Sequence, residues 1–77
     1  MMLRIVDTNF LSDKDWIFEL TDDANHLYYI LDAAMYKDLG IKTPISKKHL
    51  DCYQHGHEIN ADISVFSGRN IVISILE

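Results

Sequence analysis

The C-terminal third of the chain shows the clearest alternation of apolar and polar positions. The apolar positions form two sets, one on each side of the stretch "SGRN": Ile59, Ala61, Ile63 and Val65, then Ile71, Ile73 and Ile75. A period of two with many β-branched residues around a Gly-containing turn predicts a β-hairpin. In its second half the intervening positions are also mostly apolar, so we expect this strand to be covered or paired on both sides.

Residues 16–31 predict a second hairpin. In "DWIFEL" the side chains of Trp16, Phe18 and Leu20 fall on one face, and the turn-forming cluster "TDDAN" follows. The stretch "HLYYIL" then resumes the pattern, and we assign Tyr29 and Leu31 to the core. The opposite face of these strands would carry Ile17, Tyr28 and Ile30. The opening segment "MLRIVD" predicts a further strand with Leu3 and Ile5 inward.

The segment between the two hairpins has helical signals. Ser46 is a good N-cap, and Gly56 is a good left-handed stop, which together predict a helix over 47–55. A shorter helical turn is indicated in "AAMYKDLG", where Met35 and Leu39 share one face. The alternative for 33–40, a continuation of the third strand, stays open at this point.

The resulting order is three strands, a helix and two strands. This order resembles the OB-fold, a small Greek-key barrel of five strands with a helix between the third and fourth. The resemblance covers nearly all of residues 1–77 but rests on element order alone. The expected fold is therefore a β-rich α+β structure, a single OB-like domain with five strands and one short helix.

Composition narrows the class of partner. The 77 residues are 48% apolar and 25% charged, which is typical of a folded domain, and the net charge is −5. Residues 1–39 hold eight acidic and three basic side chains, whereas 40–77 hold four of each. An acidic field opposes phosphate backbones and so disfavours nucleic acid. A lone cysteine, no secretory signal and no long apolar run favour a soluble cytoplasmic protein without membrane contact.

The outer strand face carries more apolar surface than a monomer needs. The predicted contact residues are Ile17, Glu19, Tyr28, Ile30 and Phe66. An apolar surface rimmed by acidic side chains is typical of a protein interface. We therefore expect a non-catalytic acidic protein-binding domain, an adaptor or inhibitor that docks on another protein, including a nucleic-acid-binding one, or that self-associates. No cofactor is expected.

Two other functions remain open. The first is single-stranded nucleic-acid binding, with Tyr28 as a stacking platform and Lys42, Lys47, Lys48 and Arg69 as phosphate contacts. The second is a small structural zinc domain built on "HLDCYQHGH", with the candidate ligands His49, Cys52, His55 and His57. The spacing argues against convergence of His49, Cys52 and His55 on one ion, because adjacent members share a helix face but the outer two diverge by about 120°. His57 follows the Gly56 stop and is able to swing round, with Glu58 or Asp51 as a further ligand. Catalysis is not expected, because one solvated helix face provides no pocket.

Overall fold

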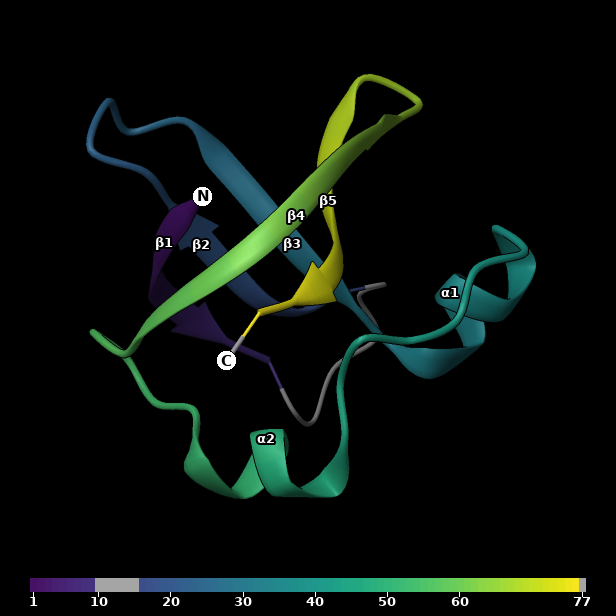
Figure 1. The fold of residues 1–77 in the computed structure, drawn as a ribbon, viewed down its shortest axis with the longest axis horizontal. Coiled ribbons are helices and arrows are strands. Elements are labelled where there is room, and N and C mark those ends of the chain that lie inside the picture. Colours follow the sequence, from purple (N-terminus) through teal and green to yellow (C-terminus); the bar gives the residue numbers. More distant parts are fainter. Residues whose placement is uncertain (10–15, 77) are drawn as a thin grey trace.

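The computed structural model describes residues 1–9 and 16–76, apart from the side chains of Lys47 and Leu50. This part of the chain forms five strands and two short helices, which Figure 1 labels. In chain order they are β1 (Met2–Thr8), β2 (Trp16–Thr21), β3 (Leu27–Leu31), α1 (Ala33–Asp38), α2 (Lys47–Cys52), β4 (Glu58–Phe66) and β5 (Arg69–Ile75). Both predicted hairpins and the opening strand are confirmed. The helical turn indicated in 33–40 is helix α1, so the connection between β3 and β4 holds two short helices where the predicted fold had one.

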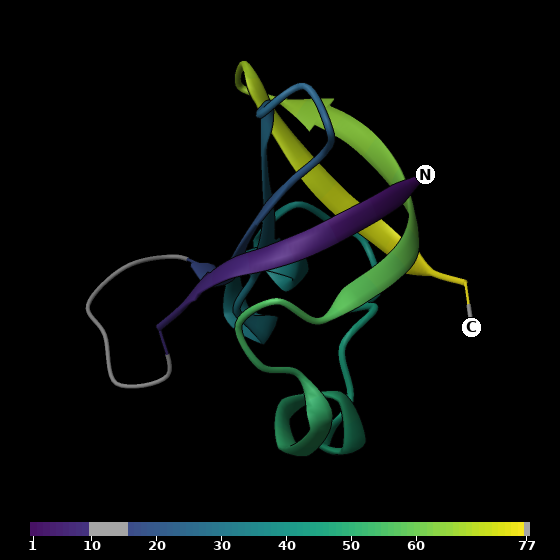
Figure 2. The same cartoon turned by 90° about the vertical axis from the view of Figure 1, so that its left-hand side faces the viewer.

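The strands form one mixed sheet whose pairings close into a ring. The order around the ring is β1, β2, β3, β5 and β4, and β4 pairs in turn with β1. All pairings are antiparallel except that of β3 with β5. The view turned by 90° in Figure 2 shows α2 below the strands. As predicted, β5 has a partner strand on each side.

The inside of the ring is filled by apolar side chains. Leu3 and Ile5 of β1 are buried, as predicted, and so are the alternating Trp16, Phe18 and Leu20 of β2. The described residues that form the buried core are Leu3, Ile5, Trp16, Phe18, Leu20, Tyr28, Ile30, Leu31, Tyr36, Tyr53, Ile59, Ala61, Ile71 and Val72. Among the described residues, none with a polar or charged side chain is buried, apart from the tyrosine hydroxyls. Burial of this apolar surface is the main stabilising term of the fold.

The predicted faces of β3 were wrong for Tyr28, Tyr29 and Ile30, whereas Leu31 is buried as predicted. Tyr28 and Ile30, which we assigned to the outer face, are 6% and 0% exposed, whereas Tyr29 is half-buried. The segment from Leu27 to Leu31 is apolar at every position, so alternation fits either face equally well. A register shift opposite Trp16 and Phe18 also lets Ile30 and Leu31 be buried in succession.

The β4–β5 hairpin closes with a two-residue turn. Phe66 pairs with Arg69, and the intervening Ser67 and Gly68 have φ values of 51° and 77°. Two successive residues with positive φ give the turn whose twist matches that of the flanking strands. Ile71 and Val72 pair in regular succession with Ser64 and Ile63, so their side chains point to opposite faces of β5, and both are buried. This explains why β5 is apolar at nearly every position.

Helix α2 begins as predicted and ends earlier. The Ser46 side chain accepts the backbone N–H of His49, and Nδ1 of His49 accepts the backbone N–H of Ser46 at 3.0 Å, which makes a reciprocal capping box. The helix stops at Cys52 because Tyr53 is extended and turns its ring into the core, where 3% of it is exposed. Gly56 lies in the turn that follows, so His55 is not helical.

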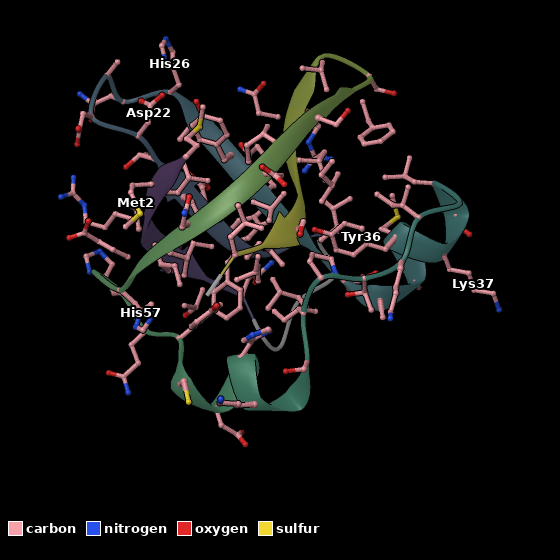
Figure 3. All side chains as sticks on the ribbon, viewed as in Figure 1. Met2, Asp22, His26, Tyr36, Lys37 and His57 are labelled. Atoms are coloured by element: carbon pink, nitrogen blue, oxygen red, sulfur yellow. The ribbon has the colours of Figure 1, made fainter. Side chains whose placement is uncertain are left out.

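Helix α1 is anchored to the sheet by Tyr36, which is 0% exposed. Its hydroxyl donates to the carbonyl of Val72 in β5 at 2.6 Å and accepts the backbone N–H of Leu31 in β3 at 3.3 Å. Figure 3 shows Tyr36 between β5 and α1. Among the described residues, the register of β3 with β5 rests on one pair, Tyr29 opposite Ile71. The Tyr36 hydroxyl therefore adds a link between two strands that have little main-chain pairing of their own. Burial raises the pKa of Tyr36, so this hydroxyl keeps its proton.

We expect Tyr36→Phe to lower the free energy of unfolding by about 1–3 kcal/mol, because two main-chain groups lose a buried hydrogen-bond partner while the ring still fills its space. Urea denaturation followed by circular dichroism measures the loss. Tyr29→Phe is the control, because Tyr29 is only half-buried. Equal stability of wild type and Tyr36→Phe would contradict a structural role for the hydroxyl.

The β2–β3 turn is organised by the carboxylate of Asp22. One oxygen accepts the backbone N–H groups of Ala24 and His26, and the other accepts the hydroxyl of Tyr28 at 2.7 Å. Nδ1 of His26 lies 3.0 Å from that second oxygen. The Tyr28 hydroxyl first of all, and the His26 contacts after it, hold the pKa of Asp22 well below its ordinary value. The same bond raises the pKa of Tyr28.

These contacts predict an acid-dependent loss of stability. Because the pKa of Asp22 is lower in the folded state, the stabilisation is complete above the unfolded pKa of about 4 and is lost as pH falls below it. Urea midpoints at pH 6 and pH 3 should differ more for wild type than for Asp22→Asn. Asp23→Asn, a change in the exposed neighbour, should behave like wild type. A pH dependence of Asp22→Asn equal to that of wild type would contradict this assignment.

Candidate functional site

The predicted contact residues divide between surface and core. Ile17 and Glu19 are half-buried and alternate with the buried positions of β2, so they lie on its outer side. Phe66 is half-buried at the end of β4. Tyr28 and Ile30 are in the core and cannot contact a partner while the ring is intact. Three of the five predicted residues are therefore accessible, on β2 and at the β4–β5 turn.

The accessible aromatic residue of β3 is Tyr29. Its ring lies beneath the guanidinium of Arg69, whose central carbon is 4.6 Å from the ring centroid. The ring of Trp16 lies 6.0 Å away at a tilt of 50°. Glu19 is the register partner of Tyr29 across β2 and β3. This places an aromatic ring, a cation and a carboxylate on adjacent strands of one outer face.

Sequence reasoning missed the pair formed by Tyr29 and Arg69. The two residues are 40 positions apart, and they meet because β3 and β5 run parallel with Tyr29 opposite Ile71. Alternation along β3 was the available signal, and it was ambiguous. A cation over an aromatic face is held by the ring quadrupole. Such a pair supplies stacking area and hydrogen-bond donors and is suited to binding.

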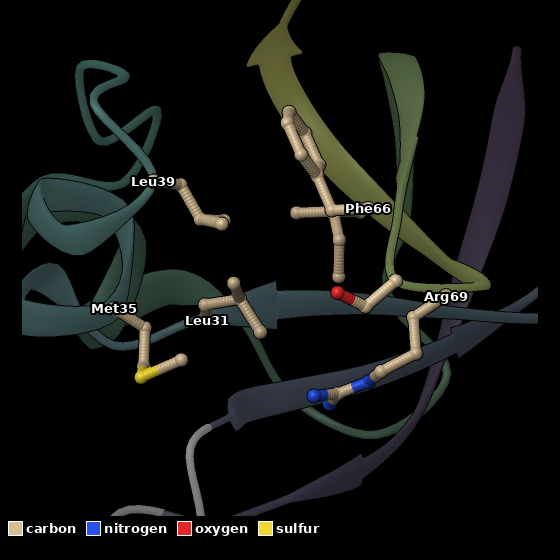
Figure 4. A pocket seen from close by; sticks show the side chains of 7 residues that line it. Leu31, Met35, Leu39, Phe66 and Arg69 are labelled. Atoms are coloured by element: carbon tan, nitrogen blue, oxygen red, sulfur yellow. The ribbon is translucent and has the colours of Figure 1, made fainter.

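An apolar pocket adjoins this pair. Figure 4 shows its lining residues, which are Leu31, Met35, Leu39, Phe66, Ser67, Arg69 and Ile71. The cavity volume is about 70 Å³. The walls come from the end of β3, from α1, and from the β4–β5 turn with the start of β5. Arg69 therefore contacts Tyr29 and also lines the pocket.

The basic residues expected to contact phosphate do not line one groove. Lys48 lies on α2, and Arg69 lies at the start of β5 next to the β4–β5 turn. Figures 1 and 2 both show α2 and this turn at opposite ends of the molecule. Lys42 belongs to the connection between α1 and α2, and the side chain of Lys47 lies outside the described part. Tyr28, the predicted stacking platform, is buried.

Two of the three histidines of "HLDCYQHGH" pack against a tyrosine ring. The ring of Tyr53 is stacked on His49, with centroids 5.1 Å apart, and is tilted against His57 at 4.8 Å. Cys52 is exposed at the end of α2, and His55 lies in the following turn. In Figure 3 His57 lies at the start of the segment that leads into β4. Within the described residues, no three His, Cys, Asp or Glu side chains form a group suited to a metal ion.

Comparison with protein-family models, with curated proteins and with solved structures gives no match to this chain. The described part of the chain contains no helix with the length and hydropathy needed to cross a membrane. The site must therefore be interpreted from its own geometry, in which the outer face of β2 and β3 meets the pocket beside Arg69.

The face assignment of β3 can be tested with two matched substitutions. Ile30 is fully buried and Ile17 is half-buried, although both were predicted to lie outside. We expect Ile30→Val to lower the free energy of unfolding by about 1 kcal/mol. Ile17→Val should change it by less than about 0.5 kcal/mol. Chemical denaturation of the two variants provides the comparison, and a larger loss for Ile17→Val would contradict the assignment.

Proposed function

We propose that this protein is a non-catalytic acidic protein-binding domain that acts as an adaptor or inhibitor. It docks on another protein through the outer face formed by Ile17, Glu19, Tyr29, Phe66 and Arg69. The observation that carries the proposal is the stacking of Arg69 over Tyr29 beside an apolar pocket. Tyrosine and arginine are enriched among the residues that dominate binding at protein interfaces.

We further propose that the ring is an OB-like barrel. The strand order, the parallel pairing of β3 with β5 and the helical connection between β3 and β4 support this. OB-folds bind ligands on the face of strands 2 and 3 and with the loops between strands 1 and 2 and between strands 4 and 5. Tyr29 lies on this face, and Arg69 directly follows the β4–β5 turn. The proposed contact surface is thus where an OB-fold places its ligands.

Electrostatics favour a protein over a nucleic acid as the partner. The net charge is −5, and Glu19 is the register neighbour of Tyr29. A phosphate group placed against this face is therefore repelled by a carboxylate. Arg69 is the one basic residue among the five described residues of the proposed face, and a single arginine neutralises too little charge for strong phosphate binding. The nucleic-acid alternative retains one favourable observation, the Tyr29–Arg69 pair, which suits base stacking.

Photo-crosslinking tests the proposed face. A benzoylphenylalanine at position 29 should crosslink the full chain to a defined protein in extracts of the source cells. The same residue at position 58, which is exposed on β4 and pairs with β1, should not. Arg69→Ala should weaken binding of the purified partner by about 2 kcal/mol, roughly thirtyfold in Kd.

Equal crosslinking at both positions would contradict the proposal. A crosslink to a second copy of the chain, together with a dimer mass in light scattering, would replace the heterologous partner by self-association. Submicromolar binding of an oligothymidylate that Tyr29→Ala abolishes would support the nucleic-acid alternative instead.

A further inference from the structure

The edge of β4 that faces away from β5 is paired along only part of its length. Residues 2–4 of β1 pair with 58–60, and Met1 exchanges main-chain hydrogen bonds with Ala61. Beyond Ala61, in the part of the chain that the structure describes, no strand pairs with 62–66 on this side. Figure 1 shows this half of β4 running up to the turn with β5, away from the N-terminus. We call the unpaired side of residues 62–66 the open edge.

The alternation of β4 determines which main-chain groups the open edge presents. Phe66 is the last residue before a two-residue turn, so its N–H and C=O groups face β5. Those of Ala61 face the other way and bind Met1. The irregularity in the pairing places its extra residue in β5, so the alternation along β4 is unbroken. Ile63 and Val65 therefore have the orientation of Ala61, and their N–H and C=O groups have no hydrogen-bond partner among the described residues on this side.

The side chains of the open edge do little to prevent pairing with another strand. The segment contains neither lysine nor proline, which natural edge strands often carry against such pairing. Ile63 and Val65 are β-branched and suited to a strand, and Val65 is 63% exposed. A strand that pairs here gains main-chain hydrogen bonds and removes Val65 from water.

The open edge is complementary to itself. Ile63 and Val65 are two positions apart, so a second copy fits antiparallel to the first with a two-fold axis at Ser64. Ile63 of each copy then lies opposite Val65 of the other, and each such pair exchanges two main-chain hydrogen bonds. Every donor and acceptor of the two open edges is satisfied, so this contact closes at the dimer.

The charges along the open edge are compatible with this register. Asp62 is the one formally charged residue of 62–66, and it lies opposite Phe66 of the second copy. The two Asp62 positions are separated by the rise of four strand residues, about 14 Å, which exceeds the Debye length of about 8 Å at physiological salt. The net charge of −5 per copy repels the copies at longer range, so added salt should strengthen the dimer.

We propose that the protein forms a two-fold symmetric dimer through antiparallel pairing of residues 62–66 of β4. The inference does not rest on the proposed function, because it concerns a main-chain edge and needs no contact through Tyr29 or Arg69. A contact limited to one short strand per copy buries a small area, so association is reversible and increases with protein concentration.

Cysteine crosslinking of the full chain tests the register. In a Cys52→Ser background, Ser64→Cys places two thiols at the two-fold axis, where the Cα atoms of a non-hydrogen-bonded pair lie about 4.5 Å apart, a separation that a disulfide spans. Asp62→Cys is the matched control, because position 62 is more exposed than position 64 but its two copies are about 14 Å apart. Mild oxidation should give roughly tenfold more covalent dimer for Ser64→Cys. Equal or greater crosslinking of Asp62→Cys would overturn the inference.

Sedimentation equilibrium provides an independent test. The average mass of the wild type should rise from 8.9 kDa towards twice this value as concentration increases. Val65→Pro removes an N–H that does not face β5, and the two intermolecular hydrogen bonds lost by symmetry should weaken the dimer by roughly five- to a hundredfold. Val65→Lys should weaken it as well, whereas Leu76→Lys, a change at another exposed apolar residue, should behave like wild type. Circular dichroism checks that each variant is folded.

Three results would overturn the inference. The first is a wild type that stays monomeric up to about 1 mM, the concentration at which even a weak dimer is populated. The second is a dimer that Val65→Lys does not weaken, which would place the contact elsewhere. The third is a crosslink from Ser64→Cys to a different protein in cell extracts without a crosslink between copies, which would assign the open edge to a strand of that protein.

Discussion

Closure of the ring of strands depends on the junction between β3 and β5, which we call the seam. Main-chain pairing alone holds these two strands together only weakly. Between β3 and β5 the register rests on Tyr29 opposite Ile71, whereas β4 and β5 are paired from Ala61 to Phe66. The Tyr36 hydroxyl spans this seam and contacts a main-chain donor on β3 and a main-chain acceptor on β5. A side-chain oxygen thus takes the place of a ladder hydrogen bond. Because buried main-chain groups are costly to leave unpaired, closure of the ring and docking of α1 are energetically coupled.

The position of Tyr36, which anchors α1 to the sheet, also determines the shape of the candidate site. Since the ring of Tyr36 points into the core, Met35 and Leu39, which are four residues apart, lie together on a neighbouring face of the α1 segment. They become one wall of the pocket, and the floor is formed by Leu31 and Ile71 from the two strands at the seam. Arg69 begins β5 and reaches Tyr29 across the same seam. Seam, pocket and aromatic pair are one local arrangement.

Sequence patterns predicted correctly those elements in which the order of polar and apolar residues allowed a single interpretation. In β2 the polar Glu19 and the alternating Trp16 and Phe18 allowed one choice of face, and Ser46 marked the start of α2. The faces of β3 were missed because its five residues are all apolar. The end of α2 was missed because burial of Tyr53 against Phe18 outweighs a helical continuation to Gly56. The contact of Tyr29 with Arg69 requires knowledge of a parallel pairing between distant segments, which local patterns do not contain.

Ring closure also has a consequence for how the chain is made. Strand β1 pairs on one side with β2 and on the other with β4, and roughly 50 residues separate the end of β1 from the start of β4. At a synthesis rate of about 5–20 residues per second, β1 waits several seconds on the ribosome with one edge unpaired. An unpaired edge is a template for strands of other chains. Until β4 emerges, one edge of β1 therefore stays open to strands of other chains, and a factor that shields β1 during this interval would raise the yield of folded protein.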